Sequence, residues 1–422
     1  KQLETNNRLD TTMAESPGLV DEAIDGSQPM PPPRQREDSH SHSVVKVTEP
    51  RLESSSWGTK YMTYNVSVHL DDKVNARNVR RRYSDFVWLR SSLAKLFPAV
   101  VIPPLPEKRM LFKNNRFNEL RILGLRRFLY NVLSQEFLSK SGPLKAFLSP
   151  DNFEEEKKQE EAKIQTRKIP DILAEYRVHF KTALDYDVPK EPLEKMLMLK
   201  DFLSDSKKQL QALVTSCSAI ANDFYHINLQ LMKMTKEFEA MQKGEDGLIG
   251  KVPSEKKLSM IKGFGDLAQV HDDHRSHWSD FLVDAMQSEV YNIEAMQETV
   301  QIWMNYNNML TKASARMRKY SKERNVKDVA KMQAEMQDEK QLREFVAAIT
   351  KIMLQHNLRL IWKSQSVKFT TDVKGFMGVQ QRHAREQMSE IYGVCKAIEE
   401  FDAQWVVPRE LGIDGPSESK ST

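Results

Sequence analysis

The sequence predicts two structural regions: a small α+β domain with a three-stranded sheet, and then an all-α region of three long antiparallel helices. In the first region hydrophobic residues alternate with polar ones, which is typical of a half-buried strand. In the second, only Pro253 of the 18 prolines lies between Pro192 and Pro408. Because proline breaks helix interiors, this tract favours long helices.

Composition narrows the class of protein further. The chain has 422 residues, enough for two or three domains, and a net charge of only +4, so any basic binding surface has to be local. Two cysteines, Cys217 and Cys395, fit a reducing, cytoplasmic environment without a disulfide framework. No apolar stretch of about 18 residues occurs, so we expect membrane contact to be peripheral.

Changes in composition divide the chain into five segments. We expect a disordered tail, the α+β domain, a linker with an amphipathic helix, the helical region and a C-terminal tail, at residues 1–42, 43–150, 151–188, 189–405 and 406–422.

Within the α+β domain, the hydrophobic pattern predicts each element in turn. Alternating Met62, Tyr64, Val66, Val68 and Leu70 predict a strand, and residues 71–73 a turn into a partner strand over 74–83. Ser84 is a candidate N-cap for the next helix. Helical spacing places two groups on the buried faces of two helices: Phe86, Leu89, Leu93 and Leu96, and Phe117, Leu120, Leu125, Phe128, Leu129 and Val132.

The helical region divides into three runs. We expect helices over 193–243, 254–325 and 326–403, with a break at the glycines of 243–247. Steps of three and four residues, the spacing of a coiled coil, relate two sets of positions: Ile293, Met296, Val300 and Trp303, and Leu342, Phe345, Ile349, Ile352 and His356. Helices this long have to pack along each other or along another chain.

Basic residues in the first domain form a candidate phosphate site. Arg80, Arg81, Arg82 and Tyr83 end a predicted strand, a proline-rich loop ends in Lys108, and Arg121, Arg126 and Arg127 lie on the second helix. Guanidinium groups bind phosphate through forked hydrogen bonds, and lysine adds a point charge. A tyrosine can stack beneath a sugar-like ring, so this set suits a phosphorylated inositol.

The order and spacing of these motifs are similar to those of the PX (phox-homology) family. The segments RRYSDF at 81–86 and PPLPEK at 103–108, followed by the helix from Phe117 to Leu129, carry the resemblance. With three long helices after it, the chain resembles the PX-BAR sorting nexins. The BAR part of the resemblance depends on helix length and domain order.

The resemblance implies a set of lipid contacts. In phosphatidylinositol 3-phosphate, Arg82 would hold the 3-phosphate, Tyr83 would pack under the inositol ring, Lys108 would hold the 1-phosphate and Arg121 would bind the 4- and 5-hydroxyls. The alternative is structural: Arg82 and Arg121 form surface ion pairs and Tyr83 belongs to the core.

Two further segments are candidates for membrane contact. The apolar face of 162–184, formed by Ile169, Ile172, Leu173, Tyr176, Phe180 and Leu184, either lies in the bilayer interface or packs against the helical core. Between the second and third helices lies a basic stretch for which we predict contact with an anionic membrane: Lys312, Arg316, Arg318, Lys319, Lys322 and Arg324, followed by Lys327 and Lys331.

Other chemistry is not indicated. His271, Asp272, Asp273, His274 and His277 look superficially like a metal cluster, but the sequence offers no second ligand group, so we predict no metal site and no cofactor. We find no catalytic motif and no nucleic-acid module. We therefore expect a non-enzymatic sorting nexin that dimerises with itself or with a related chain, binds endosomal membranes, responds to curvature and recruits cargo or coat proteins. The alternatives are a PX-tethered coiled-coil scaffold and a cytoskeletal or motor adaptor.

Overall fold

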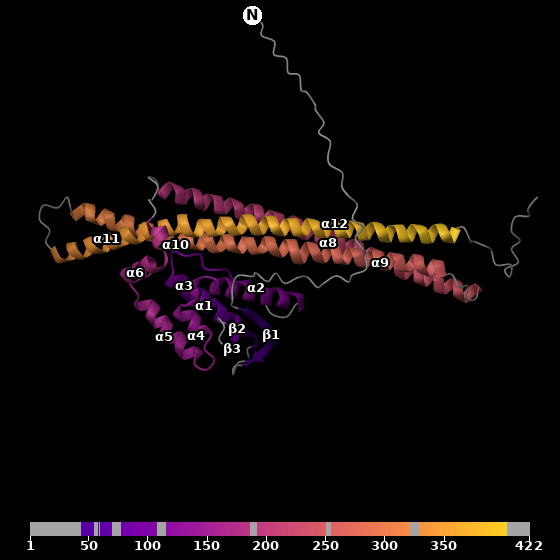
Figure 1. Ribbon diagram of the computed structural model, residues 1–422, viewed down its shortest axis with the longest axis horizontal. Helices are drawn as coiled ribbons and strands as arrows, with labels where there is room; N and C mark the ends of the chain where they lie inside the picture. The colour runs from indigo at the N-terminus through magenta and orange to yellow at the C-terminus, as the bar shows by residue number, and fades with distance from the viewer. Residues whose placement is uncertain are drawn as a thin grey trace, which may run out of the picture. The chain divides into compact units, whose positions relative to one another are not determined.

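The computed structural model describes residues 44–54, 58, 60–69, 77–107, 115–185, 192–249, 255–320 and 329–402 (Figure 1). Its first region has a sheet followed by four helices: β1 (Val44–Ser54), β2 (Lys60–His69), β3 (Arg77–Arg82), α1 (Tyr83–Leu96), α2 (Asn115–Leu133), α3 (Glu136–Ser139) and α4 (Gly142–Phe147).

The three strands form one antiparallel sheet in the order β1-β2-β3. Val66 of β2 lies opposite Val47 on one side and Val79 on the other, and all three side chains are buried. The alternating pattern of the sequence therefore places one face of the sheet against the core. A bulge interrupts β1 between Thr48 and Arg51, where Glu49 has a positive φ of 49°.

Helix α1 begins two residues earlier than the sequence indicated, with Arg82 as the N-cap in place of Ser84. Tyr83 is already helical, so the expected strand over 74–83 ends at Arg82 and Ser84 is not the N-cap. The carboxylate of Asp85 accepts a hydrogen bond from the Arg82 backbone N–H at 2.9 Å and satisfies this helix end. Phe86, Leu89 and Leu93 are fully buried, as their helical spacing predicts.

The connection to the long helices consists of three short ones, α5 (Phe153–Thr166), α6 (Ile169–His179) and α7 (Lys181–Leu184). The expected single helix over 162–184 is therefore interrupted at Arg167 and Phe180. Ile172, Leu173, Tyr176 and Phe180 are buried in the main core, where the Tyr176 ring stacks on Phe345 of the helical region. The structure therefore shows the apolar face of this segment packed against the helical core, which was one of the two hypotheses.

The helical region consists of three long segments, two of which contain a π-helical turn: α8 (Pro192–Ile249); α9 (Glu255–His277), η1 (Trp278–Val283) and α10 (Asp284–Tyr320); α11 (Val329–Ile352), η2 (Met353–Asn357) and α12 (Leu358–Asp402). The expected end near Lys243 is wrong, because α8 continues through Gly244 to Ile249.

The segments pack along one another, with α8 beside α9 and α10, α10 beside α11, and α12 beside α9 (Figure 1). The predicted apolar stripe of α10 is buried, and so is that of α11 from Leu342 to Ile352. Between them the Trp303 indole N–H donates a buried hydrogen bond of 2.8 Å to Thr350 Oγ1. The predicted fold class, a three-stranded α+β domain followed by three antiparallel helical segments, is confirmed.

Candidate functional site

The candidate site lies where β3 ends and α1 begins, beside the loop over residues 102–107. Arg82 ends the strand and its side chain is 46% exposed, so it can reach a ligand. Its Nε donates to Asp85 Oδ1 at 3.2 Å. Because Asp85 also accepts the Arg82 backbone N–H, it fixes both the main chain and the side chain of this arginine.

Tyr83 and Arg121 come together at the same place from different helices. The Arg121 guanidinium lies 5.2 Å from the centroid of the Tyr83 ring, a cation–π distance, and only 4% of the residue is exposed. Burial raises the pKa of the Tyr83 phenol, although the positive charge of Arg121 lowers it in part. The phenol therefore stays neutral at physiological pH and acts as a hydrogen-bond donor.

Side chains of α1 and α2 hold the proline-rich loop. Its prolines lack N–H groups, and its carbonyls bond to neighbouring helices: Tyr83 Oη donates to Pro106 O at 2.5 Å and Arg90 Nε to Pro103 O at 3.0 Å. Arg121 Nη2 adds a long contact of 3.4 Å to Glu107 O. Gly124 allows the close approach of α2, because a Cβ at this position would lie 2.8 Å from the Pro106 ring.

Of the four predicted lipid contacts, the structure brings Tyr83 and Arg121 together beside the loop. Arg82 precedes Tyr83 in the chain, and its guanidinium lies 5.8 Å from the centroid of the Tyr61 ring. The fourth, Lys108, lies outside the described residues. The sequence analysis missed Asp85, Arg90 and Gly124, which position the arginine and the loop. The printed sequence carried one signal for the first of these, since an acidic residue three positions after Arg82 is a common capping pattern.

Other arginines of the constellation have structural partners. Arg80 contacts Thr63 and the carboxylates of Glu49 and Glu53. Arg81 is buried and bonds to the backbone of its neighbours in the core. Arg127 pairs with Asp284 of α10 at 2.8 Å, so it links the α+β domain to the helical region.

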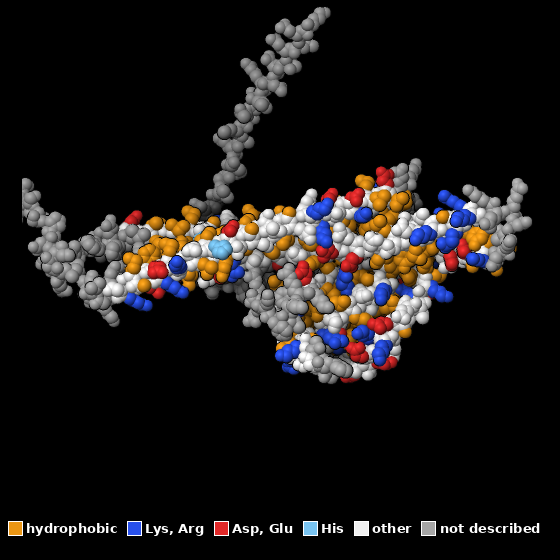
Figure 2. All heavy atoms as spheres, turned by 180° about the vertical axis from the view of Figure 1, so that it is seen from behind, with side chains coloured by type: hydrophobic (Ala, Val, Ile, Leu, Met, Phe, Trp, Pro, Cys, Tyr) orange, Lys and Arg blue, Asp and Glu red, His pale blue; other side chains and the backbone are white. Residues whose placement is uncertain are grey.

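The basic stretch between the second and third helices is only partly described. Lys312, Arg316, Arg318 and Lys319 are exposed on the last turns of α10, whereas Lys322 and Arg324 lie outside the described residues. Arg316 pairs with Glu335 of α11 at 3.1 Å, a partner that lies outside the basic stretch in the sequence. Figure 2 shows Lys and Arg side chains gathered around this end of the helical region.

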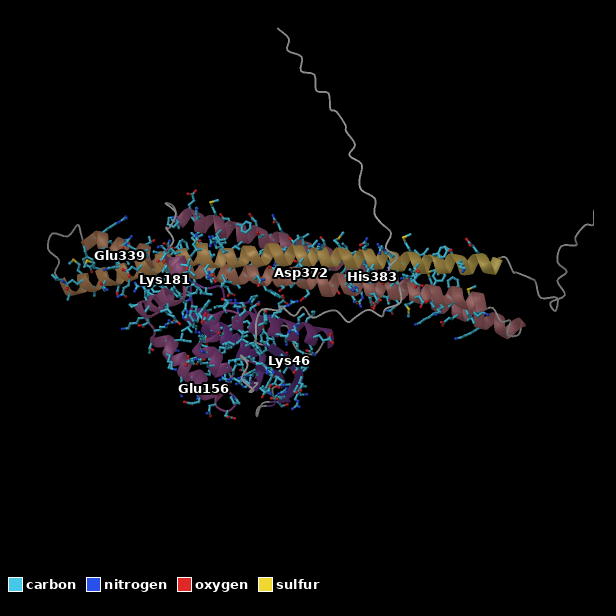
Figure 3. The ribbon with its side chains drawn as sticks, in the orientation of Figure 1. Lys46, Glu156, Lys181, Glu339, Asp372 and His383 are labelled. Carbon is cyan, nitrogen blue, oxygen red and sulfur yellow. The ribbon has the colours of Figure 1, made fainter. Side chains whose placement is uncertain are left out.

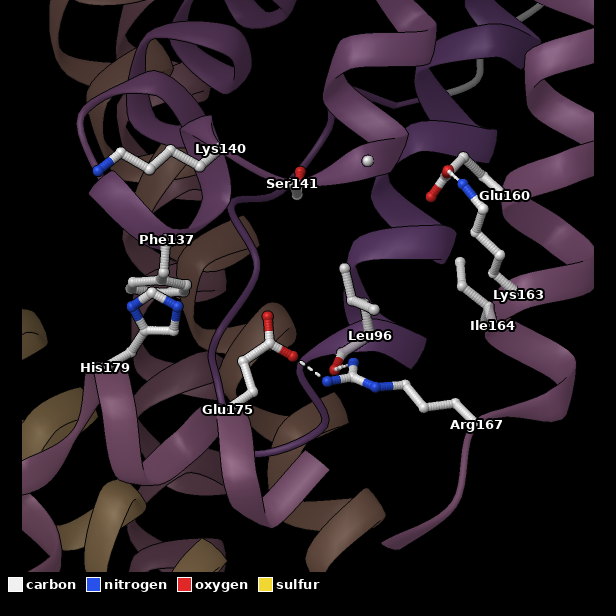
Figure 4. Close-up of a pocket in the computed structure, with 11 residues that line it drawn as sticks. Leu96, Phe137, Lys140, Ser141, Glu160, Lys163, Ile164, Arg167, Glu175 and His179 are labelled. Atoms are coloured by element: carbon white, nitrogen blue, oxygen red, sulfur yellow. Dashed lines mark hydrogen bonds and ion pairs between the residues drawn. The ribbon is translucent and has the colours of Figure 1, made fainter. Parts of the chain in front are cut away.

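Two cavities among the described residues lie away from this site. One of about 440 Å³ is lined by Leu96, Phe137, Arg167 and Glu175, among others (Figure 4). Its charges are paired with each other: Arg167 contacts Glu175, and Lys163 lies 2.6 Å from Glu160. The other, of about 740 Å³, lies beside β3 and α4 and includes Arg77 and Lys145.

Comparison with known proteins shows the class. Residues 71–151 match the PX domain family model. A solved structure, the cryo-EM structure of the SNX-BAR Mvp1 tetramer, covers 83% of this chain and 99% of that chain with a TM-score of 0.60 at 17% identity. Residues 71–151 are therefore similar to a PX domain, and the chain has the fold of a SNX-BAR protein.

Sequence relatives point to the same group. Sorting nexin-4 of Eremothecium gossypii is 27% identical over 277 residues, which is 61% of this chain and 66% of that protein. Sorting nexin-11 of Homo sapiens is 35% identical over 109 residues, 25% of this chain and 40% of the relative. The match thus spans less than half of the latter protein. Together these findings confirm the resemblance to the PX-BAR sorting nexins.

Proposed function

We propose that the chain is a non-enzymatic sorting nexin that binds phosphatidylinositol 3-phosphate through Arg82, Tyr83, Lys108 and Arg121. The observation that carries this proposal is the pairing of Tyr83 and Arg121 beside one loop, next in the chain to the exposed Arg82 at the end of β3. An exposed guanidinium held at its Nε keeps both terminal nitrogens for a phosphate. A tyrosine ring beside a nearly buried arginine offers a flat surface and donors for an inositol ring.

The helical region supports self-association. Large apolar side chains are exposed along α8 and α12, including Met241, Met388 and Tyr392, the last two 72% exposed. Figure 2 shows hydrophobic side chains gathered over these helices. A monomer rarely leaves so much long-helix apolar surface in water, so we propose a homodimer or a heterodimer with a related chain.

Membrane association then follows from two weak contacts used together. A dimer carries two headgroup sites and two basic helix ends, and joining them raises the effective concentration of each at the bilayer. Among the described residues, no helix is long and apolar enough to cross a membrane. We propose peripheral binding to the cytoplasmic face of endosomes, with curvature sensing and recruitment of cargo or coat proteins as the task.

Arg82→Ala tests the lipid assignment. In sedimentation with liposomes that contain phosphatidylinositol 3-phosphate, the variant should lose selective binding, since truncating a partly desolvated charge contact costs about 2–5 kcal/mol. Arg77→Ala is the matched control, because Arg77 is exposed at the other end of the same strand. Equal binding by Arg82→Ala and the wild type, with unchanged thermal unfolding, would remove Arg82 from the site.

Tubulation of the same liposomes separates the proposed function from its alternative. Tubules that form only with the lipid support membrane remodelling. A protein that dimerises and binds the lipid without deforming the liposomes is the PX-tethered scaffold.

A further inference from the structure

Four histidines meet in the helical region. His271, His274 and His277 lie on α9, and His383 lies on α12, about a hundred residues away in the sequence (Figure 3). The rings of His274 and His383 are 4.7 Å apart between centroids, and those of His277 and His383 are 4.6 Å apart. His271, His274 and His383 are buried. The sequence alone did not indicate that His383 lies here, where its ring contacts those of His274 and His277 from a different helix.

One contact in the cluster depends on the protonation state. His383 Nε2 lies 3.0 Å from His277 Nδ1, and the same Nδ1 lies 2.7 Å from the Asp273 carbonyl oxygen. The carbonyl can only accept, so we assign the hydrogen to His277 Nδ1, which leaves His383 Nε2 as an acceptor. A proton added to His383 Nε2 would place two N–H donors face to face, with their nitrogens 3.0 Å apart, and the hydrogen bond would be lost.

Few groups around the cluster can compensate a positive charge. From α8 the Phe224 ring packs on His274, with centroids 4.5 Å apart, and on His271. From α12 the Glu386 carboxylate lies 3.0 Å from His383 Nδ1, but it is 54% exposed, while Arg382 and Arg385 flank His383. The remaining polar and charged neighbours are Gln380, Gln387, Asp272 paired with Arg275, and Asp273 bonded by Gln269.

The energetic consequence has a definite sign. Burial lowers the pKa of His271, His274 and His383, and the neighbouring histidines lower it further, whereas Glu386 opposes this at His274 and His383. Below about pH 6.5 the unfolded chain therefore binds more protons than the folded one. The free energy of unfolding falls as the pH falls through this range, because protonation of the histidines favours the state in which the helices are separated.

The cluster lies within the part of the helical region that exposes apolar side chains. His383 is on the same helix as Met377, Met388, Ile391 and Tyr392, all exposed, and α8 carries Tyr225 beside Phe224. Loosening the α9–α12 contact would displace these side chains. Among the described residues no group of three or more His, Cys, Asp or Glu is placed to hold a metal ion.

We propose that His271, His274, His277 and His383 form a pH-sensitive lock between α9 and α12, whose protonation below about pH 6.5 weakens the association of the chain with a second copy. The effect of the lock on association rests on the proposed self-association. The lock itself can be measured separately, through the thermal midpoint of the chain.

The test uses the full chain between pH 7.5 and 5.5, a range that spares most carboxylates. The thermal midpoint of the wild type should fall by roughly 5 °C or more, and the dissociation constant of the dimer in sedimentation velocity should rise at least tenfold. His383→Gln, neutral and able to bond to His277, should remove most of both changes, and His274→Phe, which packs on Phe224, should do the same. His226→Gln on the exposed side of α8 is the matched control and should behave as the wild type.

The outcomes separate the lock from the dimer. His356, half-buried with a pKa that burial lowers, stays in every variant, so differences from the wild type belong to the cluster. A thermal midpoint that responds to pH equally in His383→Gln, His274→Phe and wild type overturns the lock. A dimer that is equally tight at both pH values overturns its effect on association. A chain that is monomeric throughout refutes the proposed dimer, and the thermal midpoints then still decide on the lock.

Discussion

Arg80, Arg81 and Arg82 are consecutive on one strand, yet each has a different role. Strand alternation sends Arg81 to the core face and its two neighbours to the other face. Arg81 Nε donates to Phe147 O at 2.9 Å, and its Nη atoms donate to Arg80 O and Ser149 O. Its guanidinium also lies 4.1 Å from the centroid of the Phe153 ring. Arg81 thus fastens the end of the α+β domain to the sheet, while Arg82 remains available to a ligand.

We expect Arg81→Ala to destabilise the fold by about 2–4 kcal/mol, because it leaves buried carbonyls without donors and a void over Phe153. Thermal unfolding of the variant measures this change. Arg77→Ala, on the exposed end of the same strand, should change stability by less than about 0.5 kcal/mol. Arg81→Ala with the stability of the wild type would show that water replaces these hydrogen bonds at no cost.

At the scale of elements, periodicity predicts which residues share a helix face, whereas the contacts between faces depend on residues far apart in the sequence. The stripes of α10 and α11 were predictable because residues three and four apart share a helix face. The hydrogen bond between Trp303 and Thr350 was not, because it joins positions 47 residues apart in the sequence. Thr350 Oγ1 also donates to Val346 O at 2.7 Å, so one buried hydroxyl serves two helices.

Thr350→Val should lower the free energy of unfolding by about 1–3 kcal/mol. The substitution keeps the shape of the side chain but leaves the Trp303 N–H buried without an acceptor. Thr311→Val on α10 is the matched control, because this threonine is exposed and bonds only to Asn307 O within its own helix. Chemical denaturation of both variants gives the comparison, and equal midpoints would mean that the indole finds another partner.

The sequence predicted the existence and type of the main elements better than their ends. Pro192 and the spacing of apolar residues indicated the long helices, but Gly244 lies inside α8, although a helical glycine costs about 1 kcal/mol. Likewise, Arg82, Tyr83 and Arg121 could be predicted from their motif. Arg90 and Gly124 could not, since their roles arise from the loop that they contact in three dimensions. Asp85 bonds to Arg82, three residues before it, and this local spacing was its signal in the sequence.

At the scale of the whole described molecule, the α+β domain and the long helices share a continuous core. Tyr176 and Phe345 belong to the same buried cluster as Phe86 and Leu129. Polar contacts accompany this core: Asn357 Nδ2 donates to Ala99 O at 2.7 Å, and Arg90, which holds the proline-rich loop, pairs with Glu298 of α10 at 2.7 Å. The candidate lipid site is therefore tied to the helical region through a residue that contacts both.

The basic end of the α10–α11 pair should contribute a second, salt-sensitive attraction to membranes. Each basic residue near an anionic leaflet contributes about 1 kcal/mol, and the attraction decays over roughly 8 Å at physiological ionic strength. Arg318 and Lys319 are exposed in the last turn of α10. Reversing both to glutamate should weaken binding to phosphatidylserine liposomes at least tenfold, and added salt should reduce the difference from wild type.

The same reversal at Lys340 and Lys374 is the matched control, because both lysines are exposed but lie farther along α11 and on α12. A helix rises about 1.5 Å per residue, so Lys340, 11 residues after the start of α11 at Val329, lies roughly 16 Å from that end, about twice the screening length. Binding of a soluble inositol phosphate headgroup should stay unchanged in both variants, since that ligand contacts only the Arg82 site. If the tip variant binds liposomes as tightly as the control, the basic end is simply a solvated helix surface. If headgroup affinity falls in parallel, the substitutions disturb the fold, and the attraction cannot be assigned to this end.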